Sequence, residues 1–149
     1  MRYDSLIRIG NAEVSAQSPT YFVADIGANH DGDLGRAKEL IYKSKEAGAN
    51  CAKFQHFLAK DIVSDEGFRS LGSQQGHQSR WQKSVFDVYE QYHCPRDWTG
   101  DLIETCEDAG VAFMTTPYDF AAIDEFAALV PAFKVGSGDI TWTDEIRYI

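Results

Sequence analysis

Short apolar runs alternate along the chain with segments of helical periodicity. Strands covered on both faces are predicted at four such runs, 21–26, 51–55, 111–115 and 132–135. Apolar positions spaced three and four apart predict helices over 34–47, 81–92, 95–109 and 120–129, and a last one that begins near Thr143. Repeated strand–helix units specify a parallel sheet with right-handed crossovers, so the expected class is α/β.

The alternation of predicted strands and helices is interrupted in two places. Residues 6–14 form two alternating runs around Gly10 and Asn11, which predicts a β-hairpin that we assign to residues 1–17. Residues 56–80 include a Ser/Gly/Gln-rich stretch without apolar period and are interpreted as a long surface loop that allows a short helical turn. The predicted organisation is one domain, with the hairpin followed by four strand–helix units over 18–149, the fourth cut short.

Composition excludes several classes of protein. The chain has 149 residues, 44% of them hydrophobic and 25% charged, which is typical of a globular protein. Fourteen basic and 23 acidic residues give a net charge of −9, which argues against a nucleic-acid partner. No apolar run approaches the length that spans a membrane, and the start lacks a signal-peptide core, so a cytoplasmic protein is expected. Three cysteines without CxxC spacing indicate neither a disulfide framework nor a zinc site.

Side chains alternate across a strand, so each predicted strand has two faces. One face is almost entirely apolar and should pack under the helices; it consists of Phe22, Ala24, Ile26, Ala52, Phe54, Val111, Phe113, Thr115, Phe133 and Val135. The other face carries polar residues toward the carboxyl ends of the strands, namely Asp25, Lys53, Gln55, Thr116 and Lys134. Parallel α/β proteins place their ligand sites at that end of the sheet.

Two lysines within short apolar strands require an explanation, because an unpaired buried ammonium loses its hydration. On one face, Lys53 and Lys134 would converge on a single pocket. The Gly136-Ser137-Gly138 turn could add backbone amides that point at an anion, which fits a small phosphorylated carboxylic acid. Simpler interpretations stay open: either lysine alone could extend to solvent, and Asp25 could be the salt-bridge partner of one of them.

The remaining candidates have structural interpretations of equal or greater weight. Asn29-His30-Asp31-Gly32 fits a turn with a helix cap. His56 is isolated and is interpreted as a loop or surface residue, and no histidine pair has metal-ligand spacing. The helical stripe 81–92, with its Trp, Val and Tyr side chains, is interpreted as core rather than as a ligand site.

Taken in order, four motifs resemble those of the sialic acid synthase family, which includes N-acetylneuraminate synthase and its legionaminate and pseudaminate relatives. ADIGANHDG at 24–32 is similar to the family's AEIGxNHxG, and AKFQ at 52–55 to its VKFQ. TTPYD at 115–119 is similar to STPFD, and PAFKVGSGD at 131–139 to PAFKIGSGE. The resemblance extends from about Ser18 to the end of the chain.

The resemblance implies a TIM-type (β/α)8 barrel that condenses phosphoenolpyruvate with an N-acetylhexosamine, typically N-acetylmannosamine. The product is a nine-carbon α-keto sugar acid, and phosphate is released. In the family a divalent metal, manganese or magnesium, polarises the sugar aldehyde. Carried over by motif, Lys53 and Lys134 should hold the phosphoenolpyruvate carboxylate and phosphate.

Further roles follow from the same motifs. Thr116 and Ser137 should donate hydrogen bonds to phosphoenolpyruvate, and Gln55 should contact the sugar. Asp25 and Asp139 occupy positions where the family has acidic residues near the reacting centre. Asp25 departs from the more usual glutamate and is one methylene shorter.

The chain ends before other parts of the family pattern. The two metal-binding histidines, the later phosphate-binding serines and the antifreeze-like domain, whose arginine completes the partner's site in a dimer, would all follow Ile149. We therefore expect the N-terminal half of a barrel with about four strands, little activity alone, metal ligands in the missing half, and a homodimer for the full-length protein.

Three other functions stay open at this stage. A 3-deoxy-octulosonate-phosphate-type synthase shares the barrel and phosphoenolpyruvate but takes a phosphorylated aldose; the NHxG and KFQ motifs weigh against it. A Schiff-base aldolase would use Lys134 or Lys53 as nucleophile. A non-catalytic domain would bind an anionic metabolite without turnover.

Overall fold

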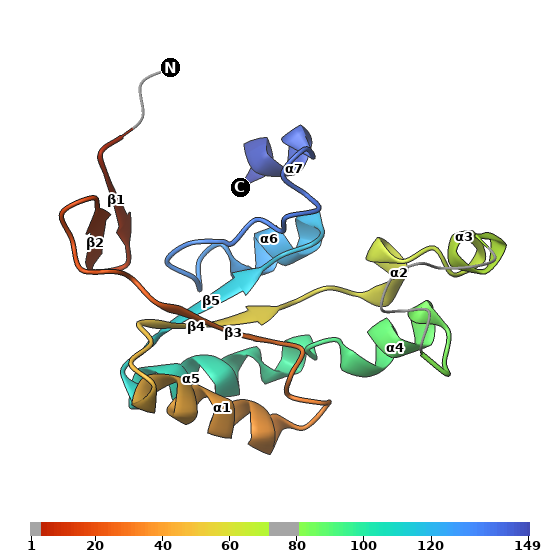
Figure 1. Cartoon of the computed structure of the whole chain (residues 1–149), viewed down its shortest axis with the longest axis horizontal. Helices are drawn as coiled ribbons and strands as arrows, with labels where there is room; N and C mark the ends of the chain where they lie inside the picture. The colour runs from red at the N-terminus through yellow and green to blue at the C-terminus, as the bar shows by residue number, and fades with distance from the viewer. Residues whose placement is uncertain (1–3, 72–80) are drawn as a thin grey trace.

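The chain forms two sheets, a two-stranded antiparallel one and a three-stranded parallel one, in a computed structural model that describes residues 4–71 and 81–149 (Figure 1). The described strands are β1 (Leu6–Ile9), β2 (Ala12–Ser15), β3 (Val23–Gly27), β4 (Cys51–Gln55) and β5 (Ala112–Thr116). The described helices are α1 (Leu34–Glu46), α2 (Ala59–Ile62), α3 (Asp65–Ser70), α4 (Val85–Tyr92), the 3-10 helix η2 (Arg96–Trp98), α5 (Thr99–Ala109), α6 (Phe120–Phe126) and α7 (Thr143–Tyr148).

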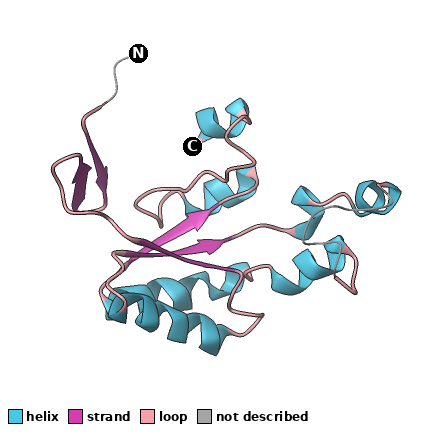
Figure 2. Ribbon diagram, in the orientation of Figure 1, coloured by secondary structure: helices cyan, strands magenta, loops and turns pink. Residues whose placement is uncertain are grey.

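The parallel sheet has the order β3-β4-β5, which is the order of the strands in the chain. Helices α1 and α5 pack against each other and against the same face of this sheet (Figure 2). Helices α2, α3 and α4 lie beyond the carboxyl ends of the strands, whereas the β1–β2 hairpin lies near the opposite end (Figure 1). Among the described residues, no helix has both the length and the apolar character needed to cross a membrane.

Local signals mark both ends of α1 and the end of α5. Asp33 precedes α1 and its side chain accepts a hydrogen bond from the Arg36 amide, as an N-cap should. Gly48 follows the helix at a φ of 89°, where a residue with a Cβ would be strained. Gly110 ends α5 in the left-handed conformation. The predicted ends at 47 and 109 agree with α1 and α5 to within one residue, whereas α5 begins at Thr99, four residues after its predicted start, and α4 begins at Val85 rather than at 81.

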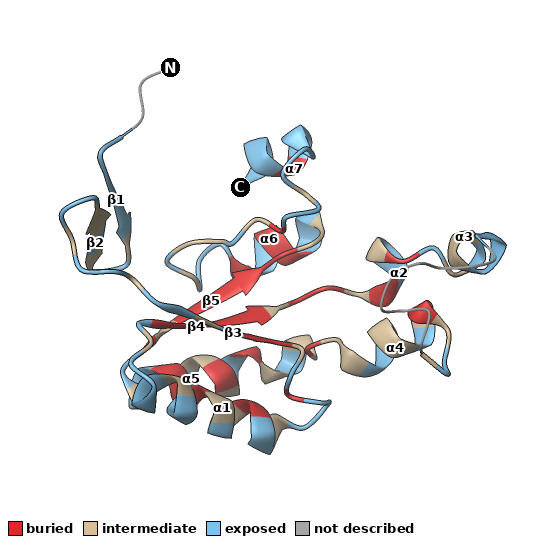
Figure 3. Ribbon diagram, viewed as in Figure 1, coloured by how far each residue is buried: buried red, intermediate tan, exposed pale blue. Residues whose placement is uncertain are grey.

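The core lies between the helices and the apolar face of the sheet (Figure 3). From the sheet, Ile26, Ala52, Phe54 and Phe113 are buried, and Phe133 packs against them. The helices contribute the rest of the buried cluster, which includes Ala37, Ile41, Leu102, Cys106, Ala122 and Phe126. The predicted division of the strands into two faces is therefore confirmed for these positions.

Two predictions about strands are wrong. Residues 132–135 do not form a fourth strand; a single parallel bridge joins Thr115 to Phe133, and the Lys134 amide donates to the Thr115 carbonyl. Pro131 lacks an amide proton and Gly136 follows, so neither flank of this segment supports continued pairing. Phe22, which was predicted to pack under the helices, is 60% exposed and precedes β3.

The loop prediction for 56–80 is only partly correct. Two short helices, α2 and α3, occupy 59–62 and 65–70. Ser64 caps the second of them by accepting from the Gly67 amide. Residues 72–80 of that predicted loop lie outside the described residues.

Burial in the core should determine the stability of the fold. Ile41 is 0% exposed, so Ile41→Ala should lower the free energy of unfolding by about 2–5 kcal/mol through lost burial and the cavity left behind. Ile7→Ala is the matched control; Ile7 is 54% exposed, and its change should stay within about 0.5 kcal/mol. Urea unfolding followed by circular dichroism measures both, and equal losses would contradict this description of the core.

Candidate functional site

An ion pair lies on the side of the sheet away from α1 and α5. The parallel register pairs Asp25 of β3 with Lys53 of β4 and Lys53 with Met114 of β5. Lys53 Nζ lies 2.6 Å from Asp25 Oδ1; the Lys53 side chain is 3% exposed and the Asp25 side chain 68%. The cation of this pair is thus buried, whereas its anionic partner faces solvent. Asp25 has the salt-bridge role that the sequence left open.

Two residues farther along the strands, Gln55 and Thr116 are paired by the same register. Gln55 Nε2 donates to the hydroxyl of Tyr118 at 3.1 Å. Thr116 is buried, and its hydroxyl has no hydrogen-bond partner among the described residues. A buried hydroxyl without a partner is costly, so Thr116 can donate to or accept from a bound ligand.

Gly27 allows these groups to lie close together. A Cβ at this position would lie 3.0 Å from Asp25 Oδ1 and 3.3 Å from Gln55 Oε1. Its φ of 55° is also one that favours glycine. The absence of a side chain therefore brings the Asp25 carboxylate and the Gln55 amide to the same point at the end of β3.

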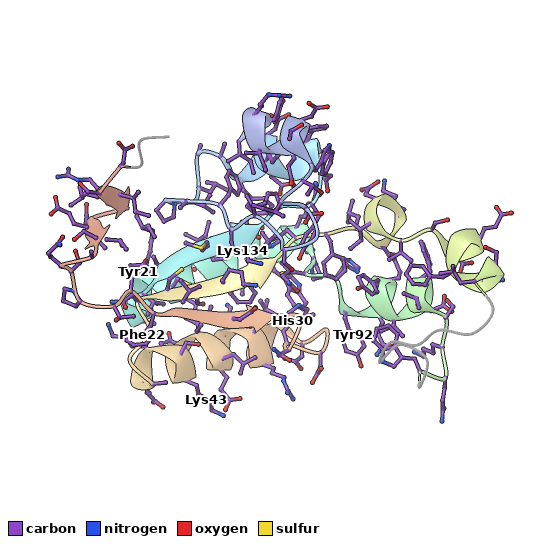
Figure 4. The ribbon with its side chains drawn as sticks, turned by 45° about the horizontal axis from the view of Figure 1, so that its top comes forward. Tyr21, Phe22, His30, Lys43, Tyr92 and Lys134 are labelled. Atoms are coloured by element: carbon purple, nitrogen blue, oxygen red, sulfur yellow. The ribbon has the colours of Figure 1, made fainter. Side chains whose placement is uncertain are left out.

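The segment after β5 supplies the second lysine. Since Phe133 bridges Thr115, alternation places Lys134 on the same side as Thr116. Lys134 is exposed, and Figure 4 shows it at the open side of the sheet. Ser137 is also exposed.

The glycine turn has free donors. No acceptor in the described part of the chain takes a hydrogen bond from the amides of Gly136, Ser137 or Gly138. Successive free amides of this kind can bind an anion.

Acidic groups surround Tyr118 on its other side. The Asp139 carboxylate packs over Gly136, where an added Cβ would overlap Asp139 Oδ2. Glu145 of α7 is buried, and its pKa is raised by burial and by the charges of Asp139 and Asp119. Burial, followed by the charges of Asp139, Tyr89, Asp25 and Glu145, raises the pKa of Tyr118 to about 12. The Tyr118 hydroxyl therefore stays protonated at neutral pH.

An aromatic pocket of about 310 Å³ adjoins Gln55. We use this name for the pocket lined by Ala28, Gln55, Phe57, Trp81, Val88, Tyr89 and Tyr92. The helical stripe had been interpreted as core, and this holds for Val85, which is buried. Tyr89 and Tyr92 of α4, and Trp81, which precedes that helix, are half-buried and line the cavity.

His56 lies in the loop directly after β4, as one of the two interpretations expects, but it is buried rather than at the surface. His56 is 0% exposed, its Nδ1 lies 2.7 Å from Thr115 Oγ1, and its ring lies 4.3 Å from that of Phe126. Burial, followed by the charges of Arg96 and His30, lowers its pKa from 6.5 to about 3. A neutral His56 thus joins the ends of β4 and β5 beneath Gln55 and Thr116.

His30, in the NHDG segment, is buried as well. Its Nδ1 accepts a hydrogen bond from the Gly32 amide, and its ring meets Trp98 edge-on with centroids 5.5 Å apart. This geometry agrees with a turn. The cap of α1 comes from Asp33.

The described residues offer no site for a metal ion. Among those described, no three His, Cys, Asp or Glu side chains are arranged to hold one. We therefore derive no step through a metal held by this chain.

Sequence reasoning missed three groups near the site. Tyr118 lies where the similar family motif has Phe, and that single departure was a usable signal. Glu145 shows only as an acidic residue on a short helix, so nothing in the sequence indicated its burial. His56 follows the alternation of Ala52 and Phe54, which could have placed it on the buried face.

Comparison with known proteins adds independent information. A family model described as the NeuB family matches residues 40–149. N-acetylneuraminate-9-phosphate synthase of Homo sapiens is 34% identical over 127 residues, which cover 85% of this chain and 34% of that protein. N,N'-diacetyllegionaminic acid synthase of Legionella pneumophila is 32% identical over 122 residues, covering 81% of this chain and 34% of the other.

The fold has a counterpart among solved structures. The crystal structure of the spore coat polysaccharide biosynthesis protein SpsE from Bacillus subtilis matches with a TM-score of 0.72 and 28% identity. The match covers 96% of this chain and 36% of that one. The chain spans about a third of the length of the curated relatives it matches.

His56 should make the stability of the protein depend on pH. The unfolded chain binds a proton at His56 near pH 6.5, whereas the folded protein does so only near pH 3. The stabilisation from a neutral His56 is thus complete above about pH 6.5 and is lost as the pH falls toward 3. Within this window the loss approaches about 1.4 kcal/mol per pH unit.

Urea unfolding between pH 7 and pH 4 measures this dependence. His56→Gln keeps a hydrogen-bonding side chain but does not titrate, so its free energy of unfolding should fall less steeply with decreasing pH. The same slope in both proteins would show that His56 is not buried in its neutral form.

Gly136 and Gly138 form a matched pair for the turn. Gly136→Ala should lower the free energy of unfolding by about 1–3 kcal/mol, because its Cβ would displace the Asp139 carboxylate. Gly138→Ala meets nothing within 4 Å and should change the free energy by less than about 0.5 kcal/mol. Equal effects in urea unfolding would contradict the position assigned to Asp139.

Proposed function

Because the chain belongs to the NeuB family, we propose that the protein carrying it condenses phosphoenolpyruvate with the open-chain aldehyde of an N-acetylhexosamine. The new bond joins the third carbon of phosphoenolpyruvate to the aldehyde carbon. Water adds at the second carbon and phosphate leaves, so the product is a nine-carbon keto sugar acid. The named relatives support this proposal, since they are synthases of sialic-type acids.

We propose that the sheet is the N-terminal part of a (β/α)8 barrel. In a barrel, neighbouring strands follow chain order and the helices cover only the outer face. The order β3-β4-β5 and the position of α1 and α5 on one face support this arrangement. A doubly wound sheet would instead have helices on both faces and a reversal of strand order.

The observation that carries the proposed function is the buried Lys53 ammonium. Its single charge is neutralised by Asp25, whose side chain is mostly exposed and able to move when an anion arrives. A carboxylate or phosphate of phosphoenolpyruvate can then take charge-assisted hydrogen bonds from Lys53, each about 1.5–3 kcal/mol. The free hydroxyl of Thr116 lies two residues farther along the sheet.

Lys134 and the backbone amides of residues 136–138 would face the opposite side of the bound anion. Lys134 is exposed on the same side of the sheet, and the amides of residues 136–138 have no acceptor among the described residues. In this proposal Lys134 and Ser137 bind the charged end that Lys53 does not reach. Asp139, beside Tyr118, would lie near the reacting carbons.

Titration calorimetry with phosphoenolpyruvate tests the proposal on the protein that carries this chain. Lys53→Met should weaken binding by roughly 10- to 100-fold, the equivalent of about 1.5–3 kcal/mol. Lys134→Met should weaken it in the same direction. Lys60→Met is the control, because Lys60 is exposed on α2 and faces no proposed ligand group.

Circular dichroism must show that each variant is folded, since removing one partner of a buried pair can also destabilise the protein. Unchanged affinity in both folded variants would eliminate the anion site. Reduction with borohydride in the presence of pyruvate should leave Lys53 and Lys134 unlabelled; a labelled lysine would favour a Schiff-base aldolase instead.

A further inference from the structure

Arg96 connects the 3-10 helix η2 to the start of α6. Its Nη2 donates to Asp119 Oδ2 at 2.8 Å, and its Nη1 lies 3.3 Å from Glu125 Oε2. The Arg96 side chain is 22% exposed and that of Asp119 17%. In the described part of the chain, no other ion pair has both side chains less than a quarter exposed. Solvent therefore screens this pair less than the exposed ones, and its geometry should be the better defined.

The Asp119 carboxylate is held on both of its oxygens. While Oδ2 accepts from Arg96, Oδ1 accepts from the Ala122 amide at 2.7 Å as the N-cap of α6. Two residues earlier, Pro117 is buried and its ring fixes the backbone φ. Tyr118 thus lies between two residues whose conformations are fixed, so this short segment sets the direction of its side chain.

Tyr118 extends this order to the proposed reaction site. Its hydroxyl accepts a hydrogen bond from Gln55 Nε2 at 3.1 Å, which leaves Gln55 Oε1 on the side of Gly27. On the same face of β4, Lys53 lies two residues before Gln55, about 7 Å along the strand. The Gln55 amide therefore faces the reactant that would meet phosphoenolpyruvate there.

Arg96 also lies close behind the ends of the strands. Glu125, one of its two partners, is followed by Phe126, whose ring lies 4.3 Å from that of His56. The Arg96 charge contributes to the lowered pKa of His56, which directly follows Gln55 in the chain. The path from Arg96 to the proposed site is therefore short.

Taken with the proposed function, on which this step rests, these contacts extend the site to a residue behind it. We propose that Arg96 is a positioning residue for the condensation. It fixes Asp119, Asp119 fixes Tyr118, and Tyr118 holds the Gln55 amide in the orientation that the sugar meets beside phosphoenolpyruvate. The last contact needs a hydroxyl at position 118, where the similar family motif has Phe, so the arrangement is particular to this chain.

A double-mutant cycle on the protein that carries this chain tests the proposal, with phosphate release from phosphoenolpyruvate and N-acetylmannosamine as the assay. Arg96→Met and Tyr118→Phe should each lower kcat/KM for the sugar by about 10-fold, which is within the coupling seen in one hydrogen-bonded network. In the Tyr118→Phe background, Arg96→Met should lower it by less than about 2-fold more, because the path to Gln55 is already cut. The Kd of phosphoenolpyruvate, measured by calorimetry, should stay within about 2-fold in both single variants.

Other variants separate positioning from folding. Asp119→Asn keeps a side chain that can cap α6 but loses the ion pair, so it should lower kcat/KM in the same direction with little risk to the fold. Glu125→Gln removes only the longer contact of Arg96 and should change kcat/KM by less than about 2-fold. Arg8→Met is the matched control, because Arg8 forms an exposed ion pair with Glu13 in the β1–β2 hairpin. Circular dichroism must show that each variant is folded.

The outcomes distinguish this proposal from the function on which it rests. An equal loss from Arg96→Met in both backgrounds would show that Arg96 does not act through Tyr118, and would overturn the proposal while leaving the condensation standing. Unchanged kcat/KM in folded Arg96→Met and Asp119→Asn would have the same meaning. Absence of phosphate release by the unsubstituted protein would instead contradict the condensation, and the proposal would fall with it.

Discussion

Burying an ammonium group is costly unless it is paired or hydrogen-bonded, and this constraint organises the site. Lys53 lies in the middle of the short strand β4, between Ala52 and Phe54, where an unpaired charge would cost several kcal/mol. The register of β3 against β4 places Asp25 directly beside it, at 2.6 Å. The same register positions Gln55 and Thr116. The chemistry of the site therefore follows from strand pairing rather than from loop conformation.

Polar and aromatic groups occupy different regions of the open face of the sheet. Charged and hydrogen-bonding groups gather around Lys53, Thr116 and the glycine turn, whereas aromatic rings gather beyond Gln55. Gln55 and Tyr118 lie at the boundary, and their hydrogen bond fixes how the two regions meet.

Much of this arrangement could be predicted from local sequence. Alternation along 51–55 identified both faces of β4, and Asp33 and Gly48 marked the ends of α1, because these features depend on near neighbours in the chain. The same reasoning predicts a strand at 132–135, which the structure does not contain. Pairing needs partners on the flanks as well as an apolar run, and Pro131 and the following glycines do not supply them.

Other features depend on contacts between distant segments. The rings of α4 line a pocket because that helix lies past the sheet, which its periodicity could not show. His56 is buried by Phe126 and Thr115, about 60–70 positions away in the chain. Tyr118, which follows β5, belongs to the site because it accepts a hydrogen bond from Gln55 of β4. Long-range packing decides such positions, whatever the local pattern.

A crystal structure of the protein with phosphoenolpyruvate bound tests the central claim most directly. The account predicts a carboxylate or phosphate oxygen within hydrogen-bond distance of Lys53 Nζ, with the Asp25 carboxylate moved away from its position in the free protein. Phosphoenolpyruvate bound elsewhere, with the Lys53–Asp25 ion pair undisturbed, would contradict it.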